Sequence, residues 1–71
     1  MSEITKTFMM QEALEKMRLE KYPKDRGEMT SQCDVFAFMA RQHSIAVSHP
    51  SAQTKILAQA VFAAWEIYKS E

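Results

Sequence analysis

Proline interrupts this chain of 71 residues at only two positions, Pro23 and Pro50, and the single glycine, Gly27, follows closely after the first. Proline cannot continue a helix interior and glycine favours turns, so these residues predict two connections. The segments between them are rich in helix-favouring residues, and so few turn residues argue against an all-β domain. We therefore predict an all-α protein, a small three-helix bundle with helices over residues 3–21, 31–47 and 51–69.

Apolar residues recur at helical spacing in each segment, which predicts one buried stripe per helix. Thr30 or Ser31 is the expected N-cap of the second helix, and Cys33 is expected to be a small buried side chain on its inner face. The expected core joins three stripes: Leu14 and Met17 with Met10 and Ala13 beside them, Phe36 and Met39, and Leu57, Val61, Ala64 and Tyr68.

The length of the chain limits how much core it can build. A chain this short hides only about 60% of the surface that its unfolded form exposes. The apolar arc of the third helix is also wider than one core needs, so we expect a single helical domain over residues 1–71 that is completed by homodimerisation. The residues predicted to form a dimer or partner interface are Phe38, Ile45, Phe62 and Trp65.

Nine basic and nine acidic residues give a formal net charge of zero, so no global field would steer the chain onto nucleic acid or anionic lipid. The longest apolar tract, residues 56–68, is too short to span a bilayer, and the first residues do not resemble a secretory signal. Cys33 is the only cysteine and cannot form an internal disulfide. A cytoplasmic protein is the expectation.

The side chains that could carry chemistry do not form a known constellation. Cys33 and His43 share a broad face of one helix, but ten residues separate them, which is roughly 15 Å along the axis. With His49 they make three candidate zinc ligands, whereas a closed structural site needs four. One glycine cannot make a glycine-rich phosphate loop. We therefore expect no enzyme, no cofactor and no metal.

Five basic residues cluster around the first connection, with only two acidic residues among them. Such a patch could contact nucleic acid or an acidic partner, although it also suits the negative C-terminal end of a helix and an ordinary solvated surface. The cluster consists of Lys16, Arg18, Lys21, Lys24 and Arg26.

Residues 46–57, AVSHPSAQTKIL, resemble the turn and recognition-helix start of helix-turn-helix repressors. The resemblance implies that Ser51, Gln53, Thr54 and Lys55 would face base edges or phosphates in the major groove. The chain departs from that pattern at Ala46, where a glycine is usual, and at Gln42, where a small alanine is usual.

Two functions therefore remain open from the sequence. The one that the apolar patterning favours is a small non-enzymatic regulatory or inhibitory protein, which binds a larger protein partner through apolar helix faces. The alternative is a dimeric helix-turn-helix DNA-binding regulator.

Overall fold

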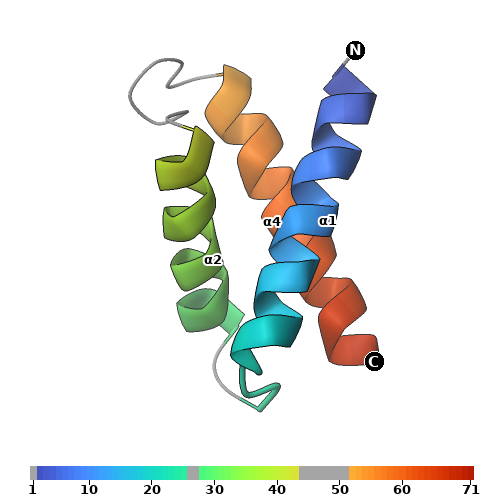
Figure 1. The fold of residues 1–71 in the computed structure, drawn as a ribbon, viewed down its shortest axis with the longest axis vertical. Helices are drawn as coiled ribbons and strands as arrows, with labels where there is room; N and C mark the ends of the chain where they lie inside the picture. The colour runs from blue at the N-terminus through green and yellow to red at the C-terminus, as the bar shows by residue number, and fades with distance from the viewer. Residues whose placement is uncertain (1, 26–27, 44–51) are drawn as a thin grey trace.

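A computed structural model describes residues 2–25, 28–43 and 52–71, and these form three α-helices with no strand among them. The helices are α1 (Ser2–Glu20), α2 (Glu28–His43) and α4 (Ala52–Ser70). The predicted all-α class and the small three-helix bundle are confirmed (Figure 1). No helix in the described part of the chain is both long and apolar enough to cross a membrane.

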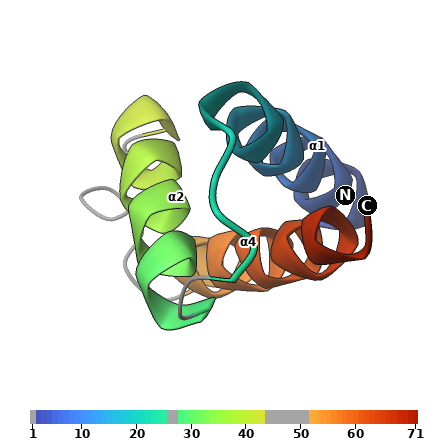
Figure 2. The same cartoon turned by 90° about the horizontal axis from the view of Figure 1, so that it is seen from below.

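The three helices alternate in direction, so α1 and α4 run the same way and α2 runs against both (Figure 1). The contact between α1 and α4 is the most extensive of the three, and that between α1 and α2 is the smallest. Seen from below, α4 lies next to both α1 and α2 (Figure 2), and it makes more contact with each than they make with each other. The helix α4 is therefore the shared support on which the other two pack.

One continuous core lies between the helices, and α4 contributes the largest share of it. The predicted stripe of α4 is buried at every position, with Ala60 and Trp65 added to it. From α1 the core takes Met9, Ala13, Leu14 and Met17. The small residues Ala13, Ala60 and Ala64 are each 0% exposed, which fits helices that approach closely.

The prediction for α2 was wrong in its start and in the burial of Cys33, whereas Met39 is buried and Phe36 packs against the core as expected. The helix begins at Glu28, so Thr30 and Ser31 lie inside its first turns instead of capping it. Its buried residues are Ser31, Val35 and Met39, spaced by four, whereas Cys33 is exposed. The reason is that α2 contacts both neighbours, so its inner face is centred on Val35, between the flanks that meet α1 and α4.

The end of α1 forms a recognisable C-cap. Lys21 adopts a left-handed conformation with φ of 55°. Its N–H donates to the carbonyl of Arg18, and the N–H of Tyr22 donates to the carbonyl of Met17. This pair of bonds is the Schellman motif, which satisfies carbonyls left open at the helix end. The motif ends α1 at Glu20, three residues before Pro23.

The turn after α1 is then tied to α4. The hydroxyl of Tyr68 donates a hydrogen bond to the backbone carbonyl of Tyr22. Tyr22 also packs against the core as a half-buried side chain. The connection that begins at Lys21 is thereby fixed across the C-terminal part of α4.

Candidate interaction surfaces

A shallow groove of about 170 Å³ lies between α1 and α2, the pair of helices with the smallest mutual contact. Leu19, on the last turn of α1, is 76% exposed at this groove. Phe38 of α2 forms its apolar floor and also packs against the core. The remaining lining residues are charged: Glu12, Glu15 and Lys16. We call this feature, lined by these five residues, the α1–α2 groove.

Two of the charged residues of the α1–α2 groove, Lys16 and Glu12, make contacts between and along helices. Lys16 Nζ lies 4.2 Å from the ring centroid of Phe38 and 3.2 Å from Glu20 Oε2. A hydrogen bond of 2.8 Å joins His43 Nε2 to Glu12 Oε1. The imidazole nitrogen is the donor, because a carboxylate oxygen can only accept. The groove therefore has an apolar centre, a cation held over its aromatic floor, and an interhelical bond that ties α2 to α1 at one end.

The four predicted interface residues do not share one surface. Phe38 is half-buried in the α1–α2 groove, and Phe62 is 53% exposed on the side of α4 that faces away from the bundle. Trp65 is 0% exposed and belongs to the core of its own chain, so the structure does not offer it to a partner. Ile45 lies outside the described residues.

The predicted polar contact residues are also separated, because α1 and α4 run in the same direction. One group lies at the C-terminal end of α1 and the connection after it, and the other at the N-terminal start of α4, at opposite ends of the bundle (Figure 1). The first group is Lys16, Arg18, Lys21 and Lys24, and the second is Gln53 and Lys55; Arg26 lies outside the described residues.

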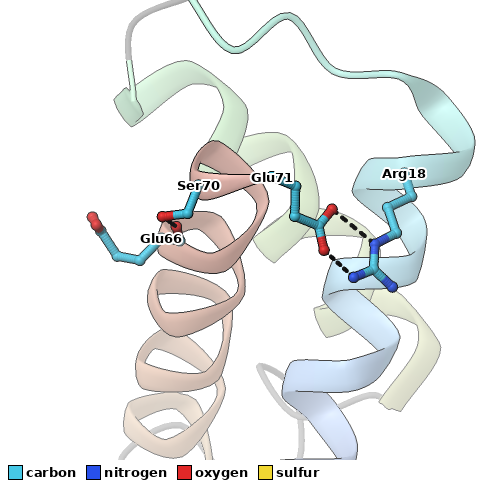
Figure 3. Close-up of polar contacts among 4 residues, drawn as sticks. All are labelled: Arg18, Glu66, Ser70 and Glu71. Carbon is cyan, nitrogen blue, oxygen red and sulfur yellow. Dashed lines mark hydrogen bonds and ion pairs between the residues drawn. The ribbon is translucent and has the colours of Figure 1, made fainter.

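Several cations of the first group already have partners within the chain. Arg18 makes a two-point contact with Glu71, its Nε donating to Oε1 at 3.0 Å and its Nη2 to Oε2 (Figure 3). This hydrogen bonding lowers the pKa of Glu71 and raises that of Arg18. Lys24 Nζ lies 5.0 Å from the ring centroid of Tyr68. These cations already contact groups of their own chain, so they are less available to bind the phosphates of a nucleic acid.

The segment that resembles a helix-turn-helix lies only partly within the described residues, because residues 46–51 are outside them. In the described part, α2 and α4 lie side by side and run in opposite directions (Figure 1). Gln53 is half-buried and Lys55 is exposed at the start of α4.

The described residues contain no group of three or more His, Cys, Asp or Glu side chains that could hold a metal ion. Sequence reasoning did not predict that Glu12 and His43 would pair, since they lie 31 residues apart and no local spacing links them. It also did not anticipate that Lys16 would cover Phe38. Both contacts join α1 to α2, so they can be predicted only when the packing of these two helices is known.

No model of a protein family matches the chain, and no curated protein or solved structure shows significant similarity to it.

Proposed function

We propose that this is a small non-enzymatic regulatory or inhibitory protein that binds a larger protein through the α1–α2 groove. The observation that carries the proposal is Leu19, which is 76% exposed beside the apolar floor formed by Phe38. Large apolar side chains gathered at a groove, unlike isolated ones, are typical of interaction sites.

The composition of the groove supports a protein partner. Interfaces combine an apolar, desolvated centre with a polar rim, and here Leu19 and Phe38 are surrounded by Glu12, Glu15 and Lys16. Complete burial of a leucine side chain contributes about 1.5–3 kcal/mol, so Leu19 alone could be a substantial part of a contact. The cation over Phe38 gives a partner carboxylate a place to bind at the edge.

The proposal is tested by capture of a partner from the native host, followed by titration of the purified pair. We expect Leu19→Asp to abolish binding, because it places a carboxylate in the apolar contact, while the helical content of the protein stays unchanged. Ile67→Asp is the matched control, since Ile67 is an exposed apolar residue of α4 that does not line the groove. Phe38→Asp is less informative because Phe38 also packs against the core.

Retained binding in Leu19→Asp would contradict the proposal. If the protein instead retains DNA with sequence preference, and that retention falls steeply as salt rises, the helix-turn-helix function is supported. The two functions are distinguished by the substitutions that abolish binding. Binding of a protein partner would be lost in Leu19→Asp, whereas DNA binding would be lost on substitution of Gln53 or Lys55, at the other end of the bundle.

A further inference from the structure

The side of α4 that faces away from α1 and α2 carries a second surface (Figure 2). Its exposed residues are spaced by three or four, so they form one stripe along the helix. We call it the outer α4 stripe, and it consists of Lys55, Ala58, Gln59, Phe62 and Glu66. Phe62, at 53% exposure, is its only large apolar side chain.

The charges of the outer α4 stripe are arranged so that the stripe is complementary to itself. Lys55 lies near one end and Glu66 near the other, about 16 Å apart at the rise of an α-helix. A two-fold axis between two antiparallel copies would bring each lysine against the glutamate of the other copy. The same register places Phe62 opposite Gln59 of the other copy.

We propose that a second copy of this chain docks on the outer α4 stripe, with the two α4 helices antiparallel. Lys55 then pairs with Glu66 of the partner subunit, and the reciprocal pair forms at the other end. Phe62 packs on Gln59 and Ala58 of the partner subunit, and the two phenylalanines form the apolar centre. This inference is independent of the proposed function, because it uses a different surface.

Charge also decides between the alternative arrangements. A parallel pairing of the same stripe would set Lys55 against its own copy and Glu66 against its own copy, which is unfavourable. The α1–α2 groove is a poorer site for a second copy, because Glu12 and Glu15 lie on the same side of α1 and would repel their counterparts. That groove therefore suits a different protein, and the outer α4 stripe suits the same one.

Glu66 is available for such a pair. Its carboxylate lies 3.6 Å from Lys69 Nζ on the same helix, but its side chain remains 51% exposed. Exposed ion pairs along one helix contribute only about 0.3–0.5 kcal/mol, so this contact does not prevent a second one. Carboxylates accept several hydrogen bonds at once.

The test is a charge exchange followed by sedimentation equilibrium over a concentration series. The wild-type protein is expected to dimerise, and Lys55→Glu and Glu66→Lys are each expected to weaken dimerisation by about tenfold or more, since each variant replaces two attractive pairs with two repulsive ones. An equal mixture of the two variants is expected to dimerise, because every lysine again faces a glutamate. Lys6→Glu on α1 and Asp34→Lys on α2, which reverse exposed charges outside the stripe, are the controls.

Three results would overturn the inference: a wild-type monomer at every concentration, single variants that dimerise as well as the wild type, or a mixture that remains monomeric. Circular dichroism verifies that each variant is folded. If either charge reversal unfolds the chain, the neutral substitutions Lys55→Gln and Glu66→Gln are used in its place. Neutral variants that dimerise as tightly as the wild type would contradict the proposed ion pairs.

Discussion

Lys21 is the residue whose backbone departs furthest from what its side chain favours. The left-handed conformation costs a non-glycine residue about 1–2 kcal/mol, and glycine avoids that cost at this position of a C-cap. We expect Lys21→Gly to stabilise the fold by about 1 kcal/mol, measured by urea denaturation. Lys21→Ala removes the same charge but keeps Cβ, so it should give no such gain. Equal midpoints for the two variants would contradict this account.

Ser31 is a polar side chain in an apolar environment, small enough to fit there. Its hydroxyl is buried and has no hydrogen-bond partner among the described residues. Loss of hydration at an unpaired hydroxyl costs about 1–3 kcal/mol, so Ser31→Ala should raise the free energy of unfolding by about 1 kcal/mol. Ser70→Ala, at an exposed hydroxyl that bonds to the carbonyl of Glu66, should not. A destabilised Ser31→Ala variant would show that this hydroxyl has a partner.

At the scale of elements, the two sides of α4 should respond very differently to truncation. Leu57 is 0% exposed in the core, whereas Phe62 is 53% exposed on the outer face. Leu57→Ala is expected to cost about 2–5 kcal/mol through lost burial and a residual cavity. Phe62→Ala, although it removes more atoms, should cost much less in a dilute, monomeric sample. Comparable denaturation midpoints would mean that the helix is rotated from the orientation described.

The contact between Arg18 and Glu71 joins the C-terminal ends of α1 and α4 and makes their packing sensitive to acid. Because the folded state lowers the pKa of Glu71, the stabilisation is present above the ordinary glutamate value of 4.5 and is lost as pH falls through the lowered pKa. Glu71→Gln should therefore lower the denaturation midpoint near neutral pH and differ less from the wild type in acid. Asp34→Asn, at an exposed carboxylate of α2, is the control.

For the whole molecule, the unequal contacts among the helices predict unequal protection. The helices α1 and α4 share the largest contact, while α2 is held mainly through α4. In native-state hydrogen exchange we expect core amides of α1 and α4 to exchange most slowly and those of α2 to open at lower free energy. Uniform protection across the three helices would indicate a fully cooperative unit instead.

Local signals in the sequence were sufficient for the number and type of the helices. Pro23 follows closely after the end of α1, and helical spacing identified four of the buried residues of α4, although it did not place Trp65 in the core. The inner face of α2 could not be predicted in this way, because a helix between two neighbours is rotated by its contacts with both. Cys33 was wrongly predicted to be buried for that reason.

The predicted interaction residues depended on the arrangement of the helices, which no local pattern encodes. Periodicity does not tell whether a wide apolar arc, such as that around Trp65, is covered by one neighbour or by two. In the same way, Lys16 and Lys55 were grouped by charge, but the common direction of α1 and α4 sets them at opposite ends.

An odd number of alternating helices also separates the two ends of the described chain. Ser2 begins α1 at one end of the bundle, and Glu71 follows α4 at the other, along a longest dimension of 32 Å (Figure 1). A circular permutant would need a linker of about ten extended residues to rejoin these ends, at about 3.3 Å per residue. Conversely, two domains fused to the two ends would be held on opposite sides of the bundle, so the fold could serve as a short rigid spacer.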